Sequence, residues 1–402
     1  MFFNWVERLA GLIVNQYMAA RFVTIDYDTP LILPPDLREW VPAGHLAHFV
    51  LDAVEGVDVG QVRVNERGTG SEEYPPRMLL ALLLYCYATG VFSSRRIERA
   101  TWDSVPVRMI SGDTHPDHTT ISTFRRENRP LLRETFVRVL ELAQELKFLQ
   151  VGQITVAVDG TKVLANASKH AAVQQERGEK PRGPEPKPPS AGPKASDQYN
   201  FTDPESRIMK AGNDQHFEQS YNAQAVVEVE SRLIVGQRVS QAVNDKQELV
   251  PSVAAIGRLV ASGAAVLADS GFYSATAVQA VERTGEGQPT GTTVYAALER
   301  KDHHRTVSDL EQKPQPEVPG PEASIDEVMR YRLRSAAGRA KYKLRQQTVE
   351  PVFGIIKSVL GFRQFLLRGL AKVQLEWQLV CLAYNLKRLH RLGAGRKTAV
   401  AG

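Results

Sequence analysis

The chain has 402 residues, of which 43% are hydrophobic and 24% charged, the composition of an ordinary globular protein with two or three domains. No apolar run reaches about 18 residues, so the sequence predicts no membrane-spanning helix. The two cysteines, Cys86 and Cys381, lie inside apolar helical runs. They exclude a disulfide framework and a cysteine-based zinc site, and they favour a reducing, cytoplasmic compartment.

The positive charge is concentrated in the C-terminal part of the chain. The formal net charge is +5, but residues 330–398 contain sixteen lysines and arginines against Glu350 and Glu376, so their net charge is +14 and the rest of the chain carries −9. A segment this basic predicts a polyanionic partner, with nucleic acid first. The alternative is a basic, solvated helix face without a partner.

The N-terminal part of the sequence predicts a helical domain over residues 18–148. Residues 1–17 carry Glu7 before any basic residue, which argues against a signal peptide, and we expect a dispensable extension with Met18 as an alternative start. The helical pattern then covers 34–41, 74–92, 93–102 and 115–149. In the last of these, Thr119 or Thr120 is the expected cap and Pro130 the expected break.

Several arginines of this helical domain are predicted to face outward, namely Arg95, Arg96, Arg125 and Arg126. Short helices with exposed arginines are compatible with a helix-turn-helix-like domain that recognises DNA. The alternative is a helical bundle that only packs against the rest of the chain.

The segment VAVDGTKV, residues 156–163, is the centre of the sequence pattern. Its small and β-branched residues predict the end of a buried strand, with Asp159 where the strand stops and Gly160 permitting a sharp exit. A carboxylate there is costly unless it is paired, hydrogen-bonded or bound to a cation; the alternative is an aspartate that caps the next turn. Residues 164–215 follow as an insertion, whose Pro-, Lys- and Glu-rich middle (about 175–200) predicts disorder or a surface loop.

The elements after the insertion alternate between strand and helix. We expect a hairpin over 221–240 that turns near Glu230 and Ser231, and a strand over 264–269 that ends in Asp269. Asp245 and Glu248 match a capping box, so Asp245 is predicted to cap a helix and not to act in catalysis. The remaining expected elements are a helix over 244–263, a helix over 275–285, a strand over 292–300, a long helix from about Asp326 to Leu360, a helix over 370–392 and a basic tail over 393–402.

This order predicts an α/β fold over residues 149–392, with a ribonuclease H-like mixed sheet flanked by helices. Asp159 ends its first strand, Asp269 ends its fourth, and Glu350 lies in the following helix. Adjoining strands can bring two such aspartates close together, and a helix can supply the third carboxylate. Three carboxylates in this order are the ligand set of a two-metal phosphoryl-transfer site, because Mg²⁺ prefers oxygen ligands and relieves the repulsion between them.

The neighbourhood of Glu350 supports a nucleic-acid site. Lys357 lies seven residues after Glu350 and Lys343 seven residues before it, on the same helix face. A carboxylate flanked by cations suits a metal with DNA phosphates running past it. Ordinary salt bridges within the helix are the alternative, but few acidic residues are present to form them.

These blocks together resemble bacterial insertion-sequence transposases of the DDE type. The helical domain of such proteins is similar to two segments of this chain, YPPRMLLALLLYCYATGVFSSRRIERAT and HPDHTTISTFRREN. Their catalytic domain is similar to five further segments, VDGTKVLANASK, SRIMK, YNAQAVV, LADSGFYS and VEPVFGIIKSVLGFRQFLLRGL. The resemblance assigns Asp159, Asp269 and Glu350 to the catalytic, metal-binding triad. Tyr342, Arg345, Glu350 and Lys357 resemble the Tyr–Arg–Glu–Lys signature, except that four residues separate Arg345 from Glu350 where the common pattern has three.

The resemblance implies a metal-dependent DNA transposase, with Mg²⁺ as the cofactor and Mn²⁺ as a substitute. Such an enzyme cleaves the ends of its insertion sequence and joins the freed 3′-hydroxyl to target DNA. Its partners are the terminal inverted repeats, the target DNA and a second copy of the chain in the synapse, with no membrane and a cytoplasmic, nucleoid-associated location. The expected DNA contacts come from Lys357, Tyr342, Arg345, Lys343, Arg125 and Arg126.

Two other functions are compatible with the sequence. One is a DNA-binding protein without catalysis, such as a repressor or a decayed transposase. The other is a structure-selective nuclease on the same fold, which would share the chemistry but show no preference for element ends.

Overall fold

The computed structural model describes residues 36–60, 62, 73–150, 152, 154–168, 172–173, 199–210, 217–256, 263–298, 317–320 and 322–401. Leu37–Gly402 forms one compact unit. The predicted extension over residues 1–17, the start at Met18 and most of the predicted disordered stretch at about 175–200 lie outside the described residues.

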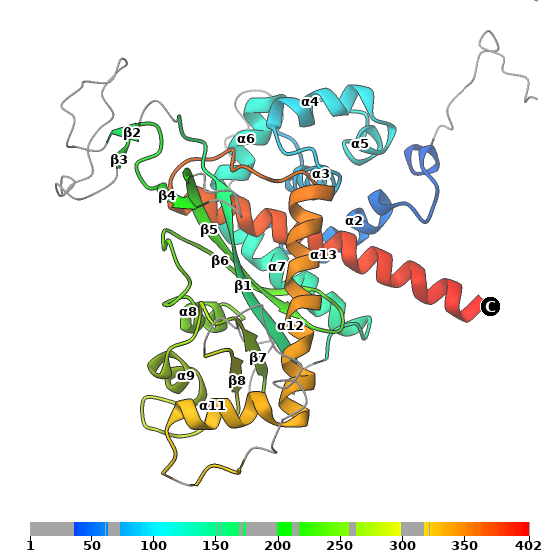
Figure 1. The fold of residues 1–402 in the computed structure, drawn as a ribbon. Helices are drawn as coiled ribbons and strands as arrows, with labels where there is room; N and C mark the ends of the chain where they lie inside the picture. The colour runs from blue at the N-terminus through cyan, green and yellow to red at the C-terminus, as the bar shows by residue number, and fades with distance from the viewer. Residues whose placement is uncertain are drawn as a thin grey trace, which may run out of the picture. The chain divides into compact units, whose positions relative to one another are not determined.

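The first part of the described chain is helical, as predicted (Figure 1). Asp117, and not Thr119 or Thr120, caps one of its helices by accepting from both of their N–H groups, and the predicted break falls at Asn128, just before Pro130. The elements are η1 (Leu37–Trp40), α2 (Leu46–Glu55), α3 (Pro76–Ala88), α4 (Ser94–Asp103), α5 (Val105–Ile110), α6 (His118–Glu127) and α7 (Arg129–Glu145).

The second part contains a mixed sheet of six strands. The strand order is β4-β5-β1-β7-β8, and β6 also pairs with β5. β5 is antiparallel to β1, β4 and β6, whereas β7 is parallel to β1 and β8 is parallel to β7. The strands are β1 (Thr155–Leu164), β4 (Arg207–Lys210), β5 (Phe217–Glu228), β6 (Ile234–Ser240), β7 (Ala265–Ala268) and β8 (Thr293–Ala296), with a separate pair, β2 (Ala172–Val173) and β3 (Tyr199–Asn200).

The sheet confirms the predicted fold class. An antiparallel hairpin beside the first strand, followed by two parallel strands on its other side, is the ribonuclease H-like arrangement. The hairpin turns between Glu228 and Ile234, as predicted, and Ser231 donates to the buried Glu228 carboxylate in the turn.

Helices after the sheet differ in length from the predicted ones. The predicted long helix is interrupted at Ser335, whose hydroxyl accepts from Gly338 N–H and caps the second half. The last helix continues to Ala401 through the residues predicted as a tail. The helical elements are α8 (Leu249–Ala254), α9 (Ala275–Glu282), α11 (Ile325–Arg334), α12 (Ala336–Gly354), the π-helical turn η5 (Ile355–Val359) and α13 (Leu370–Ala401).

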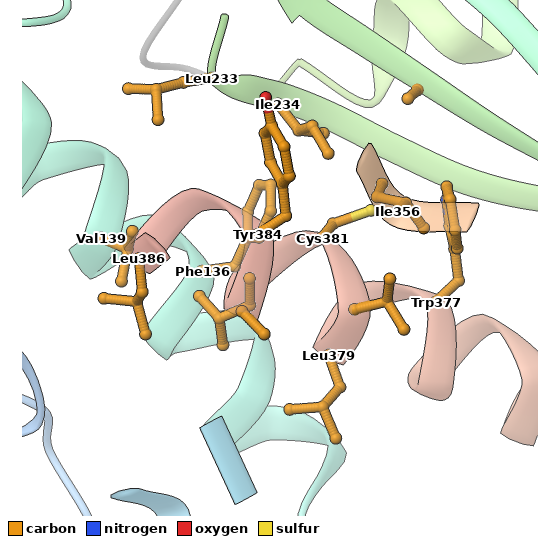
Figure 2. Close-up of a cluster of buried hydrophobic side chains, with 14 of the residues drawn as sticks. Phe136, Val139, Leu233, Ile234, Ile356, Trp377, Leu379, Cys381, Tyr384 and Leu386 are labelled. Carbon is orange, nitrogen blue, oxygen red and sulfur yellow. The ribbon is translucent and has the colours of Figure 1, made fainter. Parts of the chain in front are cut away.

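Helix α13 joins the helical part to the sheet. It packs against α3 and α7 on the one hand and against β6 on the other. Figure 2 shows Tyr384 of α13 with Phe136 of α7 and Ile234 of β6, and the sulfur of Cys381 pointing toward Ile356 of η5. All of these side chains are buried. The two parts therefore share one hydrophobic core.

No helix in the described part of the chain is long and apolar enough to cross a membrane.

Candidate active site

Asp159 lies inside β1 and not at its end, which corrects the predicted strand boundary. β7 pairs with β1 only from Thr155 to Ala157, whereas β5 continues the antiparallel pairing as far as Leu164. The hydrogen bonds to β5 keep Gly160 within the strand. Asp159 is therefore placed just past the point where the parallel neighbour stops, next to the end of β7.

Asp269 directly follows β7, as predicted. Its Oδ1 accepts a hydrogen bond from Gly271 N–H at 2.6 Å, which closes a tight turn after the strand. The parallel pairing of β1 with β7 brings this turn beside Asp159. The two predicted strand aspartates thus come from neighbouring strands of one sheet.

The two carboxyl groups share an electrostatic environment. The pKa of Asp159 is raised to about 7, mainly because the side chain is buried, and Asp269 and Asp245 raise it further. A hydrogen bond of 2.8 Å from Gly160 N–H and the nearby Arg345 guanidinium act in the opposite direction. A buried carboxyl beside other carboxyls is the arrangement that a cation would stabilise.

Helix α12 places Tyr342 and Arg345 beside these aspartates. α12 packs against β1, β5, β7 and β8. Burial raises the pKa of the half-buried Tyr342, the neighbouring Arg345 acts against this increase, and the nearby Asp269 adds to it. The Arg345 Nε is buried without a hydrogen-bond partner among the described residues. Both residues therefore belong to the aspartate site.

Glu350 lies on an exposed face of α12. It is not among the groups that most affect the pKa of Asp159. Within the described ranges, no three His, Cys, Asp or Glu side chains are close enough together to hold one metal ion. The structure brings Asp159 and Asp269 together, and Glu350 lies exposed on the helix that packs against β1 and β7.

Lys357 and Lys343, both predicted DNA contacts, have different surroundings. The Lys357 ammonium donates to the backbone oxygen of Lys162 in β1 at 2.8 Å, and burial lowers its pKa. Lys343 is exposed on α12. Lys357 therefore links η5 to the strand that carries Asp159, whereas Lys343 is presented to solvent.

Arg125 is buried, which removes it from the predicted DNA-binding surface. Only 5% of its side chain is exposed, and its guanidinium donates to the Tyr87 hydroxyl at 2.8 Å and to Phe92 O at 3.1 Å. Arg126, the next residue, is exposed. Adjacent helical residues point about 100° apart, and on α6 this turn places Arg125 on the buried face and Arg126 on the exposed one.

An exposed aromatic side chain accompanies the arginines of α4. Trp102 is 61% exposed and stacks on His115, with ring centroids 3.3 Å apart. Arg95 and Arg99 are exposed on the same helix at the i, i+4, i+7 spacing that ends at Trp102. The i, i+4, i+7 spacing of Arg95, Arg99 and Trp102 is the sequence signal that identifies this face.

Sequence analysis also missed a polar group beside Asp159. Asp245 does not cap α8: its Oδ1 accepts from Asn222 Nδ2 and Gln224 Nε2, both at 2.7 Å. The signal was the alternation of Asn222 and Gln224 with Tyr221, Ala223 and Ala225 in the buried middle of β5, because residues two apart on a strand share one face.

Family models match two segments of the chain. A model described as "Transposase DDE domain" matches residues 317–390, which include Tyr342, Arg345, Glu350 and Lys357. A model described as "Transposase domain (DUF772)" matches residues 35–127, the helical part from η1 to α6. Both segments are transposase domains. The resemblance to DDE transposases is thereby confirmed, and a role in DNA transposition follows.

One solved structure similar to this chain is a piggyBac transposase synaptic complex with hairpin DNA. The similarity covers 87% of this chain and 72% of that chain, with 8% sequence identity and a TM-score of 0.37, which is too low to carry an inference. No curated protein matches the chain.

The oxygen donors of the site suit a hard divalent cation. Asp159 and Asp269 are carboxylates from adjoining strands, and the pKa of Asp159 is raised mainly by burial and further by the neighbouring carboxylates, whose charge a cation would offset. The triad with Glu350 stays a prediction, since Glu350 lies exposed on α12, the helix that packs against β1 and β7.

Proposed function

We propose that this chain is a DNA transposase that cleaves the ends of its insertion sequence and joins the 3′-hydroxyl ends to target DNA by two-metal phosphoryl transfer. The observation that carries the proposal is the pairing of Asp159 with Asp269 on neighbouring strands of a ribonuclease H-like sheet. The two transposase domains support it.

In this proposal Asp159, Asp269 and Glu350 hold Mg²⁺, with Mn²⁺ as a substitute. The bound ions supply an activated water or hydroxyl nucleophile and neutralise charge on the leaving oxygen. Arg345 and Tyr342 flank the carboxylates and orient the scissile phosphate. Because Glu350 is exposed on α12, we propose that it joins the aspartates at the ion site when the active complex with DNA assembles.

The DNA contacts are proposed on the exposed cations. Lys343 on α12 lies on the same helix as the site, and Arg126, Arg95 and Arg96 belong to the helical part. Trp102 offers a flat apolar face among the α4 arginines, which suits stacking against a nucleobase. The partners are therefore the terminal repeats and the target, held in a synapse by two copies of the chain.

A second candidate is a DNA-binding protein without catalysis. The exposed position of Glu350 favours it, because two carboxylates alone are an incomplete ligand set for two ions. This candidate would bind the element ends with equal affinity in Mg²⁺ and in a chelator, and it would cut neither strand.

The deciding experiment is a cleavage assay on DNA that carries the element ends, compared with DNA of equal length without them. We expect cleavage that requires Mg²⁺ or Mn²⁺ and prefers the ends. Asp159→Asn, Asp269→Asn and Glu350→Gln should each lower the rate at least about 100-fold, because each removes a carboxylate from the ion site.

Asp52→Asn is the matched control, since Asp52 is exposed on α2. It should cleave like the unchanged protein. Cleavage by both aspartate variants at the unchanged rate would refute the assignment of the site, and cleavage without preference for ends would favour a structure-selective nuclease.

A further inference from the structure

Asp245 is held in a fixed position beside the aspartate site. Asn222 and Gln224 of β5 both donate to its Oδ1 at 2.7 Å. Both amide side chains are completely buried. Charge-assisted hydrogen bonds from two buried donors leave the carboxylate little freedom to move.

The network lies directly over Gly160, the residue next to Asp159. In the register of the sheet, Gln224 is opposite Gly160 and Asn222 is opposite Lys162. A Cβ at position 160 would collide with the Gln224 amide and would lie 2.8 Å from both Asn222 Oδ1 and Asp245 Oδ1. The close approach of these groups to the strand explains why a glycine stands there.

Asp245 also lies near the turn that carries Asp269. A Cβ at Gly271 would lie 4.0 Å from the Asp245 Cβ and 2.9 Å from Asp269 Oδ1. Gly271 N–H is the donor that fixes Asp269. Asp245 thus lies beside Gly160 and near the turn that carries Asp269, between the segments of the two aspartates.

A buried cation completes the network. Lys162 Nζ lies 3.9 Å from Asp245 Oδ1 and has no hydrogen-bond partner within the described ranges. The amide oxygens of Asn222 and Gln224 are also without a partner there. Buried polar groups without hydrogen-bond partners lower the free energy of unfolding. The network therefore reduces the stability of the protein, which is typical of functional sites.

We propose that Asp245 is a positioning residue that sets the spacing between Asp159 and Asp269, with Asn222 and Gln224 holding it in place. The inference rests on the proposed function, because the spacing matters for the shared binding of a divalent ion. Groups that orient metal ligands commonly affect metal affinity about 10–100-fold.

The test is the binding of Mn²⁺ alone, measured from the electron paramagnetic resonance signal of the free ion. Asp245→Ala removes the acceptor and should weaken Mn²⁺ binding about 10–100-fold. Asp245→Asn should weaken it less, because an amide oxygen can still accept from Asn222 and Gln224. Circular dichroism establishes that each variant is folded.

Asp203→Asn is the matched control. Asp203 is also buried and also contacts β5, by accepting from the Tyr221 hydroxyl at 2.8 Å, and its replacement should leave Mn²⁺ binding unchanged. If Asp245→Ala does not fold, Asp245→Asn and Asn222→Ala decide the matter, and wild-type affinity in both overturns the proposal.

Failure of this inference can be told apart from failure of the proposed function. If Asp159→Asn and Asp269→Asn lose Mn²⁺ binding while folded Asp245→Ala keeps it, only the positioning role is wrong. If all three variants bind Mn²⁺ like the unchanged protein, the ion site itself is wrong.

Discussion

Asp159 combines three properties that rarely occur together in a purely structural residue. Its carboxyl is largely buried, and among the described residues it accepts a hydrogen bond from Gly160 N–H alone. It also faces the negative charge of Asp269 and Asp245. Burial and the two neighbouring carboxylates disfavour the ionised form, whereas the single hydrogen bond favours it. The residue therefore destabilises the metal-free protein at neutral pH.

This property leads to a pH-dependent prediction for Asp159→Asn. The folded pKa is raised to about 7, so the folded protein binds more protons than the unfolded chain between about pH 4 and 7, and stability falls as the pH rises. In a chelator at pH 8, Asp159→Asn should be more stable than the unchanged protein, by at most about 4 kcal/mol. Below about pH 4 this advantage should be absent.

Urea unfolding at pH 8 and at about pH 4 measures this difference. Mg²⁺ at pH 8 should reverse the order, because an ion that binds only the folded state stabilises the unchanged protein. Equal stability of the two proteins at pH 8 in the chelator would contradict the prediction.

At the scale of the element, the register of α12 determines which of its residues face the sheet. Glu350 lies five positions after Arg345, so it points about 140° away from it around the helix; with the common spacing of one residue fewer, the angle would be about 40°. Pro351 lies within the helix directly after Glu350, and the π-helical turn η5 follows. Such turns occur frequently at functional sites, and here η5 directs Lys357 to β1.

The bond from Lys357 to Lys162 O predicts a structural role for a residue expected to contact DNA. Lys357→Met should lower the free energy of unfolding by about 1–3 kcal/mol, because it removes a half-buried, charge-assisted hydrogen bond between η5 and β1. Urea unfolding measures the change.

Lys343→Met is the control on the neighbouring helix, since Lys343 is exposed. It should leave stability within about 0.5 kcal/mol and weaken binding to duplex DNA in a mobility-shift assay. If Lys357→Met has unchanged stability but binds DNA more weakly, the structural role is wrong and Lys357 acts only in DNA binding.

At the scale of the whole molecule, a buried charged group joins the helical part to the catalytic part. The completely buried Glu376 of α13 accepts from Leu366 and Leu367 N–H at 2.9 and 3.0 Å and from the Tyr87 hydroxyl of α3 at 3.3 Å. Arg125 of α6 lies 3.9 Å from it. Burial raises the pKa of Glu376, and Arg125 acts against this increase.

Glu376→Gln should therefore destabilise the protein by about 3–5 kcal/mol, because it leaves the Arg125 guanidinium buried without its counter-charge. Adding Arg125→Met should restore part of the loss, since removal of both charges relieves the unpaired one. Thermal unfolding of the single and double variants measures both effects.

Glu145→Gln provides the surface comparison. Glu145 pairs with Arg138 at 2.7 Å, but its side chain is 54% exposed, so the change should cost less than about 1 kcal/mol. An effect of Glu376→Gln no larger than that of Glu145→Gln would contradict the role of the buried group.

Sequence periodicity alone was enough to predict the ribonuclease H-like sheet, the helical first part and the two strand aspartates. These features depend on local patterns: apolar runs of strand length, a turn at Glu230 and Ser231, and an aspartate that follows a run of small residues. Asp269 follows β7 as predicted because Gly271 closes the turn within two residues. Interactions of such short range are visible in a single sequence.

Only the tertiary structure decided where β1 ends, which arginine is exposed, and what Asp245 does. β1 continues past Asp159 because β5, more than fifty residues later in the chain, keeps supplying hydrogen bonds. Arg125 is buried because the Tyr87 hydroxyl accepts a hydrogen bond from its guanidinium and Glu376 supplies a nearby negative charge. Asp245 does not cap a helix because its carboxylate accepts hydrogen bonds from two amide side chains of β5. In each case partners distant in sequence compete with a local preference, and burial makes their hydrogen bonds and charges the stronger of the two.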